Sequence, residues 1–395
     1  MITNFLNFLF ENKQMIIPQD ILNLHDIFKS KNKELMLVGG CVRDLIMGIK
    51  PHDFDLVTNA KPDEIIKILK DKYRVDLQGK QFGVVRVFTK NFPEGLEIAS
   101  YRKDLSKGRD NKSDTQKVDI ETADIYSDSQ RRDLKMNALY YDIDKQEIVD
   151  LVGGLEDINK NIISAVGNPS ERFIEDRLRI LRTIRFASRN ISKISINTEN
   201  AIKSDKRLRN ISIIDDVSQE RIIEEFMKAI SWSIDQKNLN SLNYYLQLLD
   251  EYELFEEMFP NLTINIDNII SLNIFIILAL LFRDNNIDYL KNQLKINKFP
   301  NNIVNVIYFL LKFKNEINNV NNIPALYKEK IRFKIKNDTI NQFANILNFN
   351  NNFVKAFLKY EPKINTVELI NLGFKNIELG KEIKKREIEQ FKELL

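Results

Sequence analysis

This chain of 395 residues has little cysteine and little histidine, and it lacks long apolar runs. Its one cysteine, Cys41, excludes an intramolecular disulfide and favours a reducing compartment, so we expect a cytoplasmic protein with no disulfide partner. Two histidines are too few for a phosphohydrolase site built on clustered histidine ligands. The longest apolar run, residues 274–282, is far shorter than the ~20 residues of a membrane span. We therefore expect a soluble protein with no membrane partner.

The chain also lacks a strong excess of charge of one sign. Lys and Arg number 59 against 56 Asp and Glu, which gives a formal net charge of +3. This mild excess suits a polyanionic partner without requiring one. Strand patterns fill the first 150 residues and helical periodicity follows, which predicts an α+β protein with a small mixed β-sheet before an all-helical remainder. We expect three parts, at residues 1–152, 153–232 and 233–395.

The stretch from Leu37 to Thr58, LVGGCVRDLIMGIKPHDFDLVT, predicts a buried strand, a glycine turn, a short helix and a second strand. Side chains two residues apart on a strand share one face, so we expect Asp53 and Asp55 to point the same way. Two carboxylates so close repel one another unless a cation lies between them, and Mg²⁺, or Mn²⁺ in its place, prefers such oxygen ligands. The alternative is a surface strand with acids that occur there by chance.

The glycine turn before the short helix is typical of an anion site. Gly39 and Gly40 are expected to leave backbone N–H groups open at a helix N-terminus, and Arg43 can reach the same anion with its guanidinium. An ordinary strand-to-helix turn is the alternative. Because this turn and the paired acids of the next strand occur in one short stretch, a combined metal and phosphate site is favoured.

Further candidates follow in the sheet region. Glu97 lies on a strand expected to neighbour Asp53 and Asp55, and it is either a third acid of the site or a solvated strand acid. The segment QRRDLKMNAL offers Arg132, Asp133 and the amide of Asn137, which can bind a sugar or a base. Residues 103–117 are charged and aperiodic and are expected to form a mobile loop.

From Pro169 the pattern predicts one continuous amphipathic helix over PSERFIEDRLRILRTIRFASR. Its polar stripe is expected to carry Asp176, Arg179, Arg182 and Arg185 at helical spacing. One acid beside three arginines suits nucleotide binding, and the alternative is a solvated helix with i,i+3 salt bridges.

Five segments, in order, resemble the motifs of the class II tRNA nucleotidyltransferases, the family of CCA-adding enzymes and their bacterial poly(A) polymerase relatives. The segments are LVGGCVRD with DFD, RRDLKMNAL, VGGLEDI, ERFIEDRLRILRTIRFASR and SQERIIEEFMK, within roughly the first 230 positions. The resemblance implies a polymerase-β-like palm followed by a helical neck, body and tail, with VGGLEDI as a flexible hinge. Two departures are RRDL in place of the commoner RRDF and EDRLR with arginine where proline is usual.

The resemblance implies nucleotide or metal contacts for Gly40, Arg43, Asp53, Asp55, Arg132, Asp176, Arg179, Arg182 and Arg185. It implies two Mg²⁺ ions, with Asp53 and Asp55 as ligands, and tRNA, CTP and ATP as partners. Cytosine and adenine both present an exocyclic amine beside a ring-nitrogen acceptor, whereas uracil and guanine present a carbonyl beside an N–H. Asp176 can accept from the amine while Arg179 donates to the ring nitrogen. This pairing would select CTP and ATP without a template.

The resemblance therefore predicts addition of the 3′-terminal CCA to tRNA with release of pyrophosphate. It also predicts that the helical C-terminal half binds the tRNA. Within the enzyme class, a poly(A) polymerase or an enzyme that adds only CC or only A stays open. The segment GKQFGVV and the 103–117 loop resemble CCA-adding enzymes more than poly(A) polymerases. A non-catalytic tRNA-binding protein would have no use for acids that repel phosphate.

Overall fold

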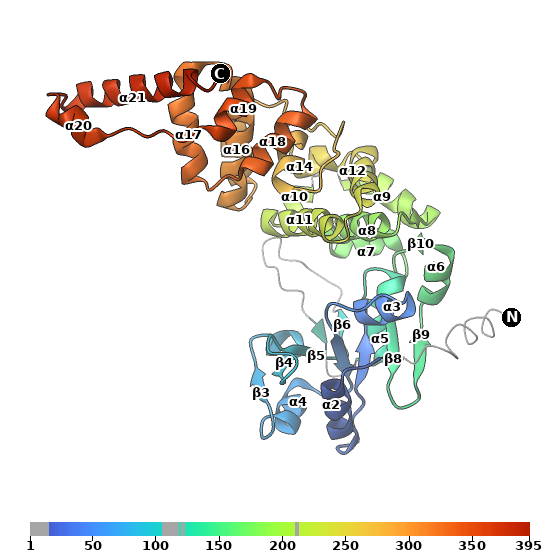
Figure 1. Cartoon of the computed structure of the whole chain (residues 1–395). Coiled ribbons are helices and arrows are strands. Elements are labelled where there is room, and N and C mark those ends of the chain that lie inside the picture. The colour runs from blue at the N-terminus through green and yellow to red at the C-terminus, as the bar shows by residue number, and fades with distance from the viewer. Residues whose placement is uncertain (1–15, 105–117, 120–122, 210–212) are drawn as a thin grey trace. The chain divides into compact units, whose positions relative to one another are not determined.

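The computed structural model describes residues 16–104, 118–119, 123–209 and 213–395. The chain forms two compact units, one within residues 1–187 and 192–210 and the other within 188–191 and 211–395. The first unit holds the sheet and the second is helical, which confirms the predicted α+β class (Figure 1). The predicted 103–117 loop lies almost wholly outside the described residues. The three-part division at 152 and 232 stays a prediction.

The first unit is built on a mixed sheet of seven strands. In spatial order they are β3 (Arg74–Asp76), β4 (Val84–Phe88), β5 (Leu96–Ser100), β2 (Asp55–Thr58), β1 (Met36–Val38), β8 (Leu139–Asp142) and β9 (Glu147–Asp150). Strands β2 and β5 are parallel and the other neighbours are antiparallel. Short strand pairs lie outside this sheet, namely β6 (Lys103–Asp104) with β7 (Val118–Asp119) and β10 (Ile162–Ile163) with β11 (Lys193–Ile194).

Alternation along the strands separates two faces of the sheet. Leu37, Leu56 and Ile98 belong to the main core, together with apolar side chains of the helices α2 (Gln19–Lys29) and α4 (Pro62–Leu69). The other face carries a smaller cluster that includes Val57 and Tyr140. Asp55 is two residues from Val57 and so shares its face, away from α2 and α4. The remaining helices of this unit are α3 (Gly40–Ile46), α5 (Ile125–Gln130), α6 (Gly154–Lys160), α7 (Pro169–Glu175), α8 (Leu178–Arg189, whose last two residues belong to the second unit) and α9 (Ile196–Arg209), with 3-10 turns η1 (Lys80–Phe82) and η2 (Lys135–Asn137).

The glycine pair that follows β9 is held in place by one carboxylate. Asp150 accepts hydrogen bonds from the backbone N–H groups of the four residues 152–155, at 2.8–3.1 Å. Gly153 has a φ of +83°, and a Cβ on Gly154 would lie 2.3 Å from the Lys135 carbonyl oxygen. The turn expected as a flexible hinge is therefore fixed at its start by local bonds and close packing.

The regular elements described in the second unit are all helices. Its helices are α10 (Ile213–Asp216), α11 (Gln219–Asp235), α12 (Leu239–Glu251), α13 (Leu254–Met258), α14 (Ile274–Leu281), α15 (Ile287–Ile296), α16 (Asn301–Glu316), α17 (Ile323–Arg332), α18 (Asn337–Ile346), α19 (Asn352–Lys359), α20 (Thr366–Asn371) and α21 (Asn376–Lys392), with the 3-10 turn η3 (Val320–Asn322). The apolar run of the sequence forms α14, where residues 276–281 are all buried. Within the described parts of the chain, no helix combines the length and apolar character that crossing a bilayer requires.

Candidate active site

The candidate acids lie near the first residues of strands β2 and β5, next to the last residue of β1. Strand β2 begins at Asp55, which lies opposite Glu97 on the parallel strand β5 and opposite Val38 at the end of β1. The prediction that Glu97 neighbours Asp55 is confirmed. The glycine turn starts directly after Val38, so the acids and the turn lie at the same edge of the sheet.

The expectation that one strand carries both Asp53 and Asp55 is wrong. Asp53 lies in a bend before β2, its side chain is 86% exposed, and its Oδ1 is 3.0 Å from His52 Nδ1. Strand β1 ends at Val38, opposite Asp55, so Asp53 has no partner residue on that strand. The charges of the two carboxylates still interact, since Asp53 contributes to raising the pKa of Asp55.

Asp55 is open to solvent on one side and surrounded by protein on the others. Desolvation, and then repulsion from Glu97, raise the pKa of its carboxyl group, while Arg132 opposes them. Glu97 forms an ion pair with Arg86 of β4 at 2.6 Å. In the described parts of the chain, no three His, Cys, Asp or Glu side chains gather as a ready metal site. The carboxylates of Asp53 and Asp55 nevertheless fit a hard cation, because a positive ion would relieve the repulsion that raises the pKa of Asp55.

The glycine turn is less open than the sequence predicts. Gly39 has a φ of +77°, which favours glycine, but its N–H donates to the Leu139 carbonyl at 2.9 Å and is not available to an anion. Gly40 begins α3, where the first N–H groups have no acceptor within the helix. A Cβ on Gly39 would lie 3.5 Å from Arg132 Nη1 and 3.6 Å from the Asn137 carbonyl oxygen. These are ordinary contact distances, so it is the positive φ of Gly39, rather than close packing, that favours glycine here.

Four predicted residues form one hydrogen-bonded chain. Arg43 Nη1 donates to Asn137 Oδ1 at 2.5 Å, and Asn137 Nδ2 donates to Asp133 Oδ1 at 3.4 Å. Asp133 Oδ2 in turn accepts from Arg182 Nε at 2.7 Å. Burial alone would raise the pKa of Asp133, but Arg182 and the surrounding hydrogen bonds lower it to about 2. This chain, which we call the Arg43–Arg182 relay, joins α3 to α8 through the segment after Gln130.

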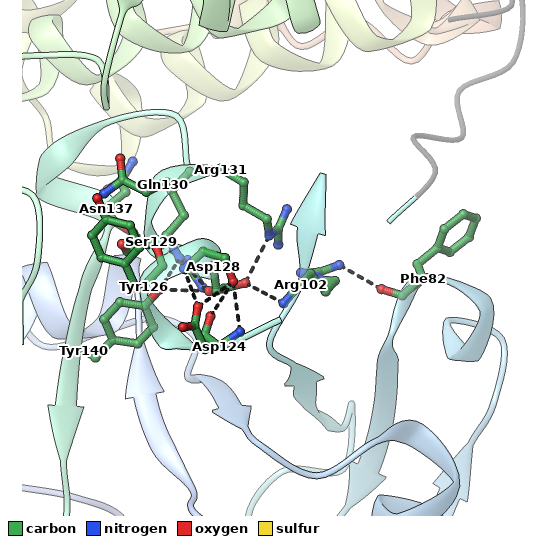
Figure 2. A network of polar contacts seen from close by, with 12 residues as sticks. Phe82, Arg102, Asp124, Tyr126, Asp128, Ser129, Gln130, Arg131, Asn137 and Tyr140 are labelled. Atoms are coloured by element: carbon green, nitrogen blue, oxygen red, sulfur yellow. Dashed lines mark hydrogen bonds and ion pairs between the residues drawn. The ribbon is translucent and has the colours of Figure 1, made fainter. Parts of the chain in front are cut away.

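Asp128 is a member of the site that the sequence analysis missed. Its buried carboxylate accepts from Arg131 at 3.0 Å, from Arg132 at 2.9 Å and from the Tyr140 hydroxyl at 2.8 Å (Figure 2). Burial raises its pKa, yet Arg132 and Arg131 outweigh this effect and lower the pKa to about 2. Arg102 also donates its backbone N–H to this carboxylate. The i,i+3 and i,i+4 spacing of an acid before two arginines was a signal for it.

The expected single helix over residues 169–189 is wrong, because the chain breaks at Asp176. Helix α7 ends at Glu175, Asp176 has extended dihedrals (φ −155°, ψ 103°), and its carboxylate accepts the Leu178 N–H at 3.1 Å. Aspartate is favoured before a helix start and disfavoured inside a helix, because its side chain satisfies a free backbone N–H. Asp176 is therefore not on the helical stripe of the three arginines.

The three arginines of α8 are anchored rather than solvated. Arg179 bonds Glu175 at 2.7 Å and the Arg131 carbonyl at 3.0 Å, and it is buried, as is Arg185. Arg182 belongs to the relay described above. The alternative of a solvated helix face is thus wrong. The departure from the family pattern, Arg177, is also buried, with 1% of its surface exposed.

Comparisons with known proteins agree with this fold. Residues 35–164 match the model of the Poly A polymerase head domain. The CCA-adding enzyme of Staphylococcus aureus is 30% identical over 342 residues, which cover 86% of this chain and 76% of that protein. Poly(A) polymerase I of Salmonella typhi is 34% identical over 237 residues, or 58% of this chain. The chain spans about half the length of that relative (47%).

A solved structure has the same fold. The CCA-adding enzyme of Bacillus stearothermophilus, in complex with CTP, superposes with a TM-score of 0.70 at 21% identity, over 95% of this chain and 93% of that one. The matched head domain and the relative aligned over most of its length place the chain among the nucleotidyltransferases. The chain belongs to the tRNA nucleotidyltransferase family, which comprises the CCA-adding enzymes and the poly(A) polymerases related to them.

Proposed function

We propose that this protein adds the 3′-terminal CCA to tRNA, without a template, from CTP and ATP with release of pyrophosphate. The observation that carries the proposal is the convergence of two groups at one edge of the sheet. The carboxylates of Asp53, Asp55 and Glu97 interact there, and the guanidinium groups of Arg43 and Arg132 lie beside the same glycine turn. Acids that bind cations beside arginines that bind anions suit a metal–triphosphate substrate.

The acids supply the site for metal ions. Asp53 and Asp55 would hold two Mg²⁺ ions, or Mn²⁺ ions, which activate the attacking 3′-hydroxyl and neutralise the pyrophosphate leaving group. Arg43, Arg132 and the N–H of Gly40 would bind the phosphates. Glu97 is ion-paired with Arg86, so binding of a metal ion by Glu97 would require that pair to open.

Asp176 and Arg179 would select the base. The Asp176 carboxylate caps α8 and the Arg179 guanidinium bonds Glu175. Base binding would replace these bonds with bonds to the amine and ring nitrogen of C or A. UTP or GTP would leave two buried groups unpaired at ~1–3 kcal/mol each, which accounts for their exclusion.

Similarity to one CCA-adding enzyme over most of the chain supports CCA addition. The similarity to a CCA-adding enzyme extends over 86% of this chain, whereas the similarity to poly(A) polymerase I covers 58%. Poly(A) synthesis, and the addition of only CC or only A, are the alternatives that the assay must separate.

The test uses the purified protein with tRNA that lacks its 3′ end, Mg²⁺ and labelled CTP, ATP, UTP or GTP, singly and combined. We expect exactly three added residues, both CTP and ATP to be required, and no incorporation from UTP or GTP. Long A tails would support the poly(A) alternative. No product with wild-type protein, when a known CCA-adding enzyme extends the same tRNA, would refute the proposed function.

A further inference from the structure

We infer that Phe186 is a positioning residue that orients three arginines of the nucleotide site with the face of its ring. The guanidinium carbon of Arg185 lies 4.3 Å from the ring centroid, that of Arg43 lies at 5.0 Å, and that of Arg182 lies at 5.8 Å. All are within the ~6 Å over which a cation is attracted to an aromatic face. The inference rests on the proposed function and adds a residue that does not itself contact the substrate.

The three arginines come from two separate elements. Arg43 lies on α3 after the glycine turn, while Arg182 and Arg185 lie on α8 with Phe186 itself. Phe186 is 6% exposed, and Arg43 and Arg185 are each 5% exposed. Burying several guanidinium groups together is unfavourable unless their charge is compensated. The negative face of an aromatic ring provides such compensation without accepting a proton or a hydrogen bond.

The ring complements the polar relay that holds the same side chains. Asp44 bonds Arg43 at 2.6 Å and Asp133 bonds Arg182 at 2.7 Å, while Asn137 lies between the two arginines. The polar groups fix the hydrogen-bonding edges of the guanidinium groups, and Phe186 supports their planes. An arginine held from both sides loses little side-chain entropy when a triphosphate binds, because it is already ordered.

This role predicts a specific kinetic pattern. Loss of the ring should weaken nucleotide binding, since the arginines would have to be ordered by the nucleotide. It should leave the affinity for tRNA unchanged and affect the KM for CTP and for ATP more than kcat. A purely structural role would instead lower thermal stability, and it would impair kcat, nucleotide binding and tRNA binding together.

The first experiment compares Phe186→Leu with Phe186→Tyr in the full chain. Leu keeps apolar character but removes the ring face, whereas Tyr keeps it. We expect the dissociation constants of CTP and ATP, measured by titration calorimetry with Mg²⁺, to rise about tenfold in Phe186→Leu and to be restored in Phe186→Tyr. The matched control is Phe88→Leu, which removes the ring 3.8 Å from Arg74 on the β3–β4 pair, away from the relay; it should leave both constants unchanged.

The second experiment separates the ring's charge distribution from its shape. Mono-, di- and trifluorophenylalanine placed at position 186 progressively weaken the negative face while barely changing the size of the side chain. We expect the dissociation constant of CTP to rise stepwise with each fluorine at constant thermal midpoint, and no such trend for the same series at position 88.

A flat series at position 186, with normal CTP binding by the wild type, would overturn this inference and leave the proposed function intact. Weak binding in Phe186→Leu that Tyr does not restore would overturn it as well, because the ring face would then be irrelevant. Failure of the wild-type protein to bind CTP would overturn the proposed function and this inference with it.

Discussion

At the scale of single residues, the site depends on carboxylates that hold partly buried arginines in fixed positions. Asp128 holds Arg131 and Arg132, and Asp133 holds Arg182. In both acids, nearby guanidinium groups outweigh burial and lower the pKa to about 2. Removal of the carboxylate leaves the charge of its arginine partner uncompensated. A substitution that removes only this charge should therefore lower the stability of the protein strongly.

Asp128→Asn is expected to destabilise the protein by about 3–5 kcal/mol, because Arg132 would lose its buried counter-charge. The wild-type carboxylate has a folded pKa of about 2 and an unfolded pKa near ~3.9. The carboxylate of Asp128 therefore stabilises the folded state fully above the unfolded pKa, and this stabilisation is lost as the pH falls from the unfolded to the folded pKa. Urea unfolding at several pH values should show a weaker acid dependence in the variant.

The control for this prediction is Asp144→Asn. Asp144 is part of an exposed ion pair with Lys29, and such pairs contribute ~0–1 kcal/mol. If Asp128→Asn were no more destabilising than Asp144→Asn, the guanidinium groups around Asp128 would not depend on its charge.

Asp55→Asn should abolish nucleotide addition and yet slightly stabilise the metal-free protein at neutral pH. Glu97 and Asp53 repel the Asp55 carboxylate and help to raise its pKa, so the folded state is favoured when this group is protonated. The gain should be below ~1 kcal/mol, because the carboxylate is open to solvent, and it should fade as pH falls through the raised pKa. Thermal melts of the variant and the wild type in EDTA at several pH values measure this gain in stability. Saturating Mg²⁺ should remove the gain. A loss of stability in EDTA at neutral pH would contradict the proposed repulsion.

At the scale of elements, the turn between β9 and α6 is held by bonds that a local sequence pattern does not reveal. One carboxylate, that of Asp150, accepts four successive N–H groups, and Gly154 packs against the backbone of η2. A glycine pair alone indicates freedom of the backbone, whereas these contacts restrict it.

Gly154→Ala is expected to destabilise the protein by several kcal/mol, because the added Cβ would lie 2.3 Å from the Lys135 carbonyl oxygen and the backbone would have to move. Gly153→Ala is the matched control. Its Cβ meets nothing within 4 Å, so only the positive φ opposes it, at roughly 1 kcal/mol. Equal unfolding free energies for the two variants would show that close packing at Gly154 is unimportant.

The break between α7 and α8 is the second feature decided at this scale. Apolar periodicity continues through the break, because Phe173 and Leu178 are both buried. Periodicity alone therefore predicts one helix. The side chain of Asp176 ends it by bonding the Leu178 N–H.

At the scale of the whole molecule, every candidate catalytic and nucleotide-binding residue lies in the first unit, and the second unit is proposed to bind tRNA. Helix α21 carries exposed lysines at positions 381, 384 and 385. The triple variant Lys381→Glu, Lys384→Glu, Lys385→Glu should raise the KM for tRNA about tenfold and leave the dissociation constant of CTP unchanged, since phosphate contacts act through charge.

The salt dependence of tRNA binding by this variant should also become shallower, because fewer counterions are released. Native gel shifts at several salt concentrations measure it. Unchanged tRNA affinity and salt dependence would place the tRNA contacts elsewhere than α21.

Much of this molecule follows from its sequence alone. The sheet within the first 150 residues, the order of strand, turn, helix and strand over residues 37–58, and the helical character from Pro169 were all predicted, because alternation, glycine positions and apolar spacing act over a few residues. The residue types of the site were predicted for the same reason, since each motif is continuous in the chain.

Only the tertiary structure decided which of those residues meet. Arg43 bonds Asn137 across 94 positions and Arg182 bonds Asp133 across 49, and no local pattern specifies such pairs. In the folded chain, the Gly39 N–H donates to the Leu139 carbonyl and Asp53 lies outside β2. Phe186 lies beside three arginines. The physical reason is that short-range preferences select the elements, whereas strand register and the packing of helices on the sheet select the partners of each polar group.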